Sequence, residues 1–310
     1  MTSNSEELAP QASGLGVARL SSAERARAYY ELAKPNLSML VVVTSILGFY
    51  LASSATEHLD WARLIYLVTG TALTAAGACA LNMYIERDID ARMMRTKGRP
   101  IPSGRLSAQQ ALAFSLVVFT WGFLQLLVFC GPYPAFLSLA TALIYAFVYT
   151  PAKRRGPISI WIGAIPGAIP PVMGWAAVRG EIGWGGLSLF LILFAWQFPH
   201  FLALAYMYEE DYRRGGFNFL FADDPDGQKV GRAIAFGTLL VHSASLAPYV
   251  LGLVGGVYLI GAILAGAFFV WAGARVAVES TLPRARQAFF ASITYLPVLL
   301  ASMVLDRLVS

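Results

Sequence analysis

Three oxygen-bearing side chains, Asn82, Glu86 and Asp90, recur every four residues at the end of a long apolar segment. A helix turns by about 100° per residue, so this spacing puts all three on one face. Charged groups at membrane depth are costly and usually line a cavity. Carboxylates suit Mg²⁺, which takes its other ligands from water and substrate phosphates. The stripe therefore predicts a metal–phosphate site, whereas Asp88 lies off it and is expected to pair with Arg92.

A basic run, MMRTKGRP (93–100), follows this stripe directly. A guanidinium group binds phosphate through two parallel hydrogen bonds, so these arginines are suited to hold the phosphates themselves. The alternative is a helix end followed by a positively charged loop at the membrane surface. That alternative accounts for three of the nearby cations without any chemistry: Arg92, Lys97 and Arg105.

A second segment, AWQFPHFLALAYMYEEDYRRGG (195–216), repeats the order of apolar span, carboxylates and arginines. Pro199 predicts a kink or an opening in its helix. His200 and Asp211 are 11 residues apart and would share one face of a continuous helix. A lone histidine in an apolar segment is equally explained by packing in the core. Two acid-then-base segments on the same side of a membrane can together hold a metal-bound diphosphate.

The composition predicts an all-α polytopic membrane protein. The 310 residues are 57% hydrophobic and 13% charged, where soluble domains carry roughly 25% charged residues. Nine apolar segments approach the ~20 residues that cross a bilayer as a helix. A bundle of nine transmembrane helices is therefore expected, with these spans: 36–56, 64–85, 109–130, 134–150, 158–178, 187–207, 233–253, 256–274 and 288–305.

The basic residues predict the orientation of these spans. With a cytoplasmic N-terminus, 20 of the 23 Lys and Arg residues fall on the cytoplasmic side, as the positive-inside rule requires. The net charge of +5 then reports orientation in the lipid bilayer, and no nucleic-acid partner is expected. Residues 1–33 are expected to form a polar cytoplasmic tail that ends in an amphipathic segment. Residues 34–310 are expected to form a single transmembrane domain, without an internal repeat.

Three motifs resemble a known family. NMYIERDIDARMMRTKGRPIPSG (82–104), YTPAKRRGPISIWIGAIPGAIPPVMGWAA (149–177) and WQFPHFLALAYMYEEDY (196–212) are similar to motifs of the UbiA superfamily of intramembrane prenyltransferases. The combination resembles most closely its protoheme IX farnesyltransferase (heme O synthase) branch. The likeness covers roughly residues 34–305.

The resemblance implies nine helices around a central cavity and a Mg²⁺-dependent transfer of farnesyl from farnesyl diphosphate. The acceptor would be a vinyl group of protoheme IX (heme b), which becomes a hydroxyethylfarnesyl group in heme O. The implied location is the bacterial cytoplasmic (inner) membrane. A partner that handles heme is also implied, such as a heme A synthase or a terminal oxidase.

The resemblance also implies roles for single residues. The metal-diphosphate would be held by four polar residues of the two acidic motifs: Asn82, Glu86, Asp90 and Asp211. Glu210 is a weaker candidate beside Asp211. The substrates would be bound by six residues: Arg95, Arg99, Lys153, Arg154, His200 and Tyr212. His200 would contact the heme, through its iron or a propionate.

One loop departs from the branch pattern, and this leaves alternatives open. After Asp211–Tyr212 the sequence RRGGFNFLFADDPDGQKVGR replaces the usual continuation. It is either a lid that alters prenyl length or acceptor, or a solvated turn rich in turn-forming residues. A quinone precursor or chlorophyllide would be the alternative acceptor. A transporter would place its carboxylates near the midplane between repeats, and a purely structural subunit would not need this carboxylate stripe.

Overall fold

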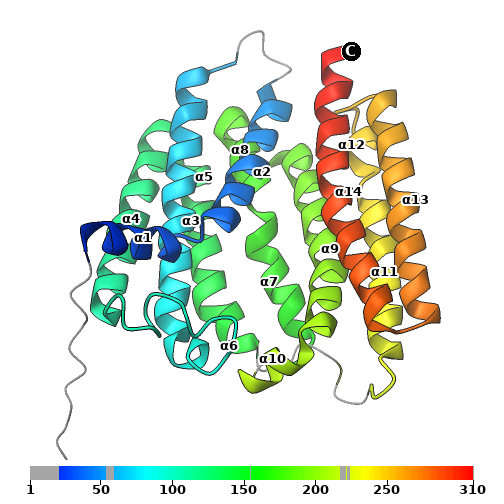
Figure 1. The fold of residues 1–310 in the computed structure, drawn as a ribbon. Coiled ribbons are helices and arrows are strands. Elements are labelled where there is room, and N and C mark those ends of the chain that lie inside the picture. Colours follow the sequence, from blue (N-terminus) through cyan, green and yellow to red (C-terminus); the bar gives the residue numbers. More distant parts are fainter. Residues whose placement is uncertain (1–20, 54–58, 154, 217–220, 222–223, 310) are drawn as a thin grey trace, which may run out of the picture.

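Every regular element in the described part of the chain is a helix. The computed structural model describes residues 21–53, 59–153, 155–216, 221 and 224–309. Figure 1 shows the helices side by side in a bundle. In chain order they are α1 (Ser22–Leu32), α2 (Pro35–Ser53), α3 (Trp61–Asp90), α4 (Ala108–Phe129), α5 (Pro132–Leu143), η1 (Ile144–Tyr149), α6 (Thr150–Ala152), α7 (Ile158–Ala168), α8 (Pro170–Arg179), α9 (Gly183–Met207), α10 (Glu209–Arg214), α11 (Gln228–Ala244), α12 (Ala247–Val250), α13 (Gly256–Val278) and α14 (Leu282–Val309).

Nine spans in the described residues are long and apolar enough to cross a membrane. They correspond in order to the nine predicted segments, so the polytopic all-helical prediction is confirmed. Two spans are composite. The fourth joins α5, the π-helix η1 and α6 within Pro132–Ala152, and the fifth joins α7 and α8 within Ile158–Arg179. Pro170 and Pro171 begin α8; proline lacks the backbone N–H that a continuous helix requires there.

Close backbone contacts hold the bundle together. Helix α2 packs along α8, and α3 packs along α4. A Cβ atom added at Gly48 would lie 1.9 Å from the Pro171 carbonyl oxygen, and one at Gly174 would lie 1.9 Å from that of Ser45. Small residues of this kind let helices approach closely in membranes, where apolar burial between helices gives little driving force. On the other side of the bundle α9 packs against α11 and α14.

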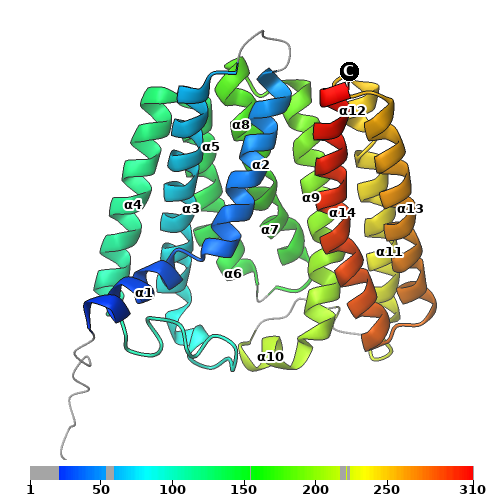
Figure 2. The same ribbon diagram turned by 45° about the horizontal axis from the view of Figure 1, so that its top comes forward.

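Helix α1 is part of the packed molecule. Ser21 caps it: the Ser21 hydroxyl accepts from the Glu24 amide, and the Glu24 carboxylate accepts from the Ser21 amide. Ala28 and Leu32 are buried against Ala80 and Met83 of α3. The segment expected to lead into the first span therefore forms a helix that lies across the bundle (Figures 1 and 2). Residues 1–20 of the expected tail lie outside the described residues.

The polar segments gather at one end of the bundle. Helix α10 and the segment between α3 and α4 lie at the same end, and the C-terminus lies at the opposite end (Figure 2). Helix α9 continues through Pro199 to Met207 and is interrupted at Tyr208, whose φ of −120° and ψ of 26° are not helical. Asp211 therefore belongs to a separate helix, and the prediction that it shares a helix face with His200 is wrong.

Candidate active site

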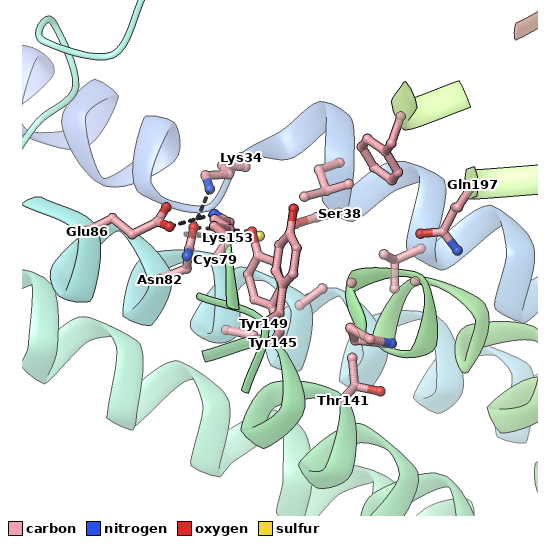
Figure 3. Close-up of a pocket in the computed structure, with 18 of the residues that line it drawn as sticks. Lys34, Ser38, Cys79, Asn82, Glu86, Thr141, Tyr145, Tyr149, Lys153 and Gln197 are labelled. Atoms are coloured by element: carbon pink, nitrogen blue, oxygen red, sulfur yellow. Dashed lines mark hydrogen bonds and ion pairs between the residues drawn. The ribbon is translucent and has the colours of Figure 1, made fainter. Parts of the chain in front are cut away.

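A cavity of about 360 Å³ is lined by five of the first six spans, all except α4. Its walls come from α2, α3, the segment after α3, α5, η1, α7, α8 and α9, with Lys153 and Tyr212 at its polar end. Polar and charged side chains gather at one side of the drawn cavity, where Glu86, Asn82 and Lys34 lie, whereas Gln197 lies at the other side (Figure 3). Much of the wall elsewhere is apolar, with residues such as Val41, Ala75 and Met173.

The predicted stripe lies on the wall of this cavity. Asn82, Glu86 and Asp90 all belong to α3, all line the cavity, and expose only 1%, 3% and 2% of their surface. Asp88 points away from them: 80% of its side chain is exposed and its carboxylate lies 3.9 Å from Arg87. The predicted pairing of Asp88 with Arg92 is wrong, because Arg87 pairs with Asp88 at the helix surface. The helix turn thus separates three buried oxygen donors from one solvated carboxylate.

Each buried carboxylate of the stripe is paired with a cation. Lys153 Nζ donates to Glu86 Oε1 at 2.5 Å. Arg99 Nη1 lies 2.7 Å from Asp90 Oδ1 and 2.6 Å from Oδ2. Breaking a buried pair leaves an uncompensated charge at a cost of about 3–5 kcal/mol. These two pairs therefore bring together carboxylates and cations that the sequence placed in the same site.

Asn82 is the centre of a hydrogen-bond network that the sequence did not reveal. Its Oδ1 accepts from Lys34 Nζ at 2.9 Å and from the Tyr145 hydroxyl at 3.2 Å. Its Nδ2 donates to Thr150 Oγ1 at 3.1 Å, and that hydroxyl donates to the Tyr145 carbonyl at 3.0 Å. Tyr145 and Tyr149 belong to η1, and π-helices are frequent at functional sites. No simple sequence pattern marks such a turn.

Lys34 belongs to the site, although the sequence suggested only that it helps to orient the spans in the membrane. It lies immediately before Pro35, has a positive φ of 45°, and lines the cavity. The pKa of its ammonium group is lowered to about 8, chiefly by burial; Cys79 and Glu86 oppose this shift, whereas Arg99 and Lys153 add to it. A positive φ is uncommon for a residue other than glycine and is kept only where the surroundings enforce it. Its position next to a proline at the start of the first span was the available signal.

The second acidic segment contacts the first. The Met94 amide donates to Asp211 Oδ1 at 3.2 Å, and Arg95 Nε lies 3.8 Å from Asp211 Oδ2. The Arg95 guanidinium also lies over the Tyr212 ring, 4.5 Å from its centroid. Arg95 and Tyr212 line the cavity, so α10 and the segment after α3 meet at its polar end. Glu210 instead pairs with Arg213 and Arg214 at the exposed surface.

His200 lies on another face of α9. Its Nδ1 is 2.7 Å from Ser292 Oγ, and its ring stacks on Trp196 and Phe289 with centroids 4.6 and 4.9 Å away. The cavity wall contains Gln197 and Phe201 from the same helix. The structure therefore does not bring His200 together with the carboxylates and cations. Arg154 lies outside the described residues.

The donor set at the polar end fits a divalent cation of the Mg²⁺ type. No three His, Cys, Asp or Glu side chains in the described ranges converge as a ready-made metal site. The available donors are the amide and carboxylate oxygens of Asn82, Glu86 and Asp90, of the hard type that Mg²⁺ prefers, and few protein ligands are usual for this ion. The carboxylates are buried and charge-balanced by Lys153 and Arg99. A complex of Mg²⁺ with diphosphate would offer a cation to Glu86 and Asp90 and an anion to Lys153 and Arg99.

Comparison with known proteins shows the class of protein to which the chain belongs. Residues 41–294 match the UbiA prenyltransferase family. The chain is 42% identical over 288 residues to the protoheme IX farnesyltransferase of Solibacter usitatus, covering 91% of this chain and 99% of that protein. It is 43% identical over 280 residues to that of Sorangium cellulosum, covering 86% and 99%. A helical bundle with a polar end of this kind is therefore that of a multi-pass membrane prenyltransferase.

Solved structures show the same fold. A digeranylgeranylglyceryl phosphate synthase has a TM-score of 0.78 at 19% identity, covering 93% of this chain and 100% of that one. A UbiA homolog from Archaeoglobus fulgidus, bound to GPP and Mg²⁺, has a TM-score of 0.60 at 13% identity, covering 89% and 99%. The chain belongs to the UbiA prenyltransferase family, and within it to the branch of the protoheme IX farnesyltransferases.

Proposed function

We propose that this protein transfers the farnesyl group of farnesyl diphosphate to a vinyl group of protoheme IX, which gives heme O. The names of its relatives, at 35–43% identity, support both substrates. The single structural observation that carries the proposal is the row of acid–base pairs at one end of a largely apolar cavity. This arrangement suits a substrate with an anionic head and a long hydrocarbon tail.

Diphosphate binding follows from an exchange of partners. Lys153 and Arg99 are held at the cavity by Glu86 and Asp90, and Lys34 adds a third cation through Asn82. Phosphate oxygens are strong acceptors for such cations, and arginine can bind them through two hydrogen bonds. Arg95 approaches the same end from the Asp211 side. When the diphosphate binds, Lys153 and Arg99 exchange their carboxylate partners for phosphate oxygens. Glu86 and Asp90 would then be available to a divalent ion.

Four residues are proposed to hold Mg²⁺ with the diphosphate: Asn82, Glu86, Asp90 and Asp211. A divalent ion held by these residues would supply positive charge to the diphosphate as it leaves. Arg99, Lys153 and Lys34 act on the same charge from fixed positions, which is electrostatic stabilisation that needs no reorganisation during the reaction.

The reaction begins when the C–O bond to the diphosphate breaks and the leaving group takes the electron pair. The vinyl group then forms a bond to the farnesyl carbon, and water captures the positive charge left beside the porphyrin. The apolar walls from α2, α3 and α8 keep other water from the allylic cation. The product carries a hydroxyethylfarnesyl group.

The placement in the membrane completes the proposal. The N-terminus and the polar end of the cavity face the cytoplasm of a bacterial cell, in its inner membrane, because the basic residues concentrate there. Residues 1–33 belong to that side, and residues 34–310 form one transmembrane domain. Arg154 is proposed to contribute to diphosphate binding. A heme-handling enzyme such as a heme A synthase or a terminal oxidase would receive the product.

His200 is the least supported member of the proposed site. Its described contacts with Ser292, Trp196 and Phe289 favour the packing of α9 against α14. A contact with heme requires the macrocycle to reach this face of α9.

The test is a product assay on the purified protein in detergent, with heme b, farnesyl diphosphate and Mg²⁺. Mass spectrometry of the pigments should find a heme heavier by one farnesyl group plus water, and an Asp90→Ala variant should not form it. If the heme is recovered unchanged while a known farnesyltransferase forms product in the same assay, the proposed acceptor is wrong. Quinone precursors would then be tested as acceptors.

A further inference from the structure

Tyr145 and Tyr149 line the cavity from the same π-helix, but their hydroxyl groups differ. Their rings stack with centroids 5.8 Å apart (Figure 3). The Tyr145 hydroxyl donates to Asn82 Oδ1 at 3.2 Å. The Tyr149 hydroxyl makes no hydrogen bond with any residue that the structure describes. Tyr149 is half-buried and lines the cavity, so its hydroxyl offers a hydrogen-bonding position to a water molecule or a ligand in the cavity.

The ring of Tyr149 is held firmly at the polar end. Lys153 Nζ lies 4.8 Å from its centroid while it also binds Glu86. On another side the ring packs on Gly163 of α7, where an added Cβ would lie 2.5 Å from Tyr149 Cε2. The tyrosine therefore stands beside the cations proposed to bind the diphosphate, and the absence of a side chain at Gly163 makes room for it.

The proposed reaction, on which this inference rests, needs a water molecule at one defined moment. After the new C–C bond forms, the vinyl carbon next to the porphyrin carries the positive charge. If water adds there, a hydroxyethyl product results. If a neighbouring carbon loses a proton instead, an alkene results, lighter by one water. Water that is free to diffuse in the cavity would also attack the earlier allylic cation. A single water held in place avoids both the alkene product and the early hydrolysis of the allylic cation.

We propose that the Tyr149 hydroxyl positions the water that captures the cation. The water donates one hydrogen bond to the Tyr149 oxygen and one to the departed diphosphate, which leaves an oxygen lone pair for the cationic carbon. The new C–O bond forms as one O–H bond of the water breaks. The proton passes to the diphosphate, the strongest base that the reaction itself supplies. Tyr149 is thus a positioning residue: it keeps its own proton throughout.

The experiment measures the ratio of hydrated to dehydrated farnesyl heme by mass spectrometry, with wild type and Tyr149→Phe. This substitution removes the hydroxyl and keeps the ring that contacts Gly163 and Lys153. We expect farnesylated heme to form in total amounts similar to wild type, with the ratio lowered about tenfold, which corresponds to about 1.4 kcal/mol at 25 °C. A purely structural role of Tyr149 would lower both products together.

The matched control is Tyr145→Phe. Its hydroxyl is bound to Asn82, so its removal should lower turnover and leave the product ratio at the wild-type value. Gly163→Ala provides a second approach, because its methyl group displaces the Tyr149 ring; it should lower the ratio as Tyr149→Phe does. If Tyr149→Phe does not fold, the ratio of the Gly163→Ala variant decides.

An unchanged ratio in Tyr149→Phe overturns the inference. Folded Tyr149→Phe that makes no farnesylated heme also overturns it, because the hydroxyl would then act before the C–C bond forms. If wild type itself gives no farnesylated heme, the proposed function fails, and that result is distinct from a normal amount of product with an unaltered ratio.

Discussion

Lys153 Nζ lies 2.5 Å from Glu86 Oε1, although 67 residues separate them in the chain. The pair connects α3 to the end of the fourth span, just after α6. Both side chains are nearly inaccessible, with 11% and 4% exposed. Because neither charge is solvated, the two partners depend on each other in a way that single and double substitutions can separate.

Lys153→Met alone should destabilise the protein by about 3–5 kcal/mol, because it leaves the Glu86 carboxylate buried without a partner. The double variant Lys153→Met with Glu86→Gln removes both charges and should recover most of that loss. Thermal unfolding in detergent measures both effects. The double variant should nevertheless remain inactive. Equal stability of single and double variants would show that the pair does not hold the two spans together.

Asp90→Ala should reduce kcat by at least about 100-fold, the range seen when one group that stabilises developing charge is removed. Asp88→Ala is the matched control, since its carboxylate is two residues away and its side chain is 80% exposed. It should retain activity close to wild type. Similar losses in both variants would argue against a specific role for the stripe and for a general effect of acidic charge.

The pH dependence should report Lys34. Its pKa is lowered to about 8, so its ammonium group is charged below that pH and neutral above it. A neutral amine attracts diphosphate less strongly, and kcat/KM for farnesyl diphosphate should therefore fall as pH rises through about 8. This parameter reflects ionisation in the free enzyme. In Lys34→Arg the charge persists at all accessible pH values, and the fall near pH 8 should disappear. If the fall in kcat/KM near pH 8 persists in Lys34→Arg, another group is responsible for it.

Asp211→Ala should raise the KM for the diphosphate substrate, because Asp211 holds the Met94 amide and Arg95 at the mouth of the cavity. Steady-state kinetics at saturating heme measure this change. Glu210→Ala is the control at the neighbouring residue: its partners Arg213 and Arg214 are exposed, and ion pairs at the surface contribute little. If both variants behave alike, the contact between α10 and the segment after α3 has no role in binding.

The spans and the stripe could be predicted because each depends on a local period. Asn82, Glu86 and Asp90 lie within one helix, so a constant turn per residue was sufficient to place them. Asp211 was misplaced relative to His200 because a single non-helical residue, Tyr208, changes the direction of the chain. The pairing of Glu86 with Lys153 and the network around Asn82 depend on how distant helices meet. A wide π turn at Tyr145–Tyr149 changes which side chains face the cavity, and no hydrophobic period reports it.

The ion pairs at Glu86 and Asp90 also bear on the order in which ligands bind. A free divalent ion entering alone would have to displace Lys153 from Glu86 and Arg99 from Asp90, with no phosphate to replace these carboxylates. A free diphosphate would likewise leave two carboxylates uncompensated. Each ligand therefore lowers the cost of binding the other, and by thermodynamic linkage the two affinities must rise together. The apparent Mg²⁺ requirement of this protein should thus decrease as the concentration of prenyl diphosphate increases.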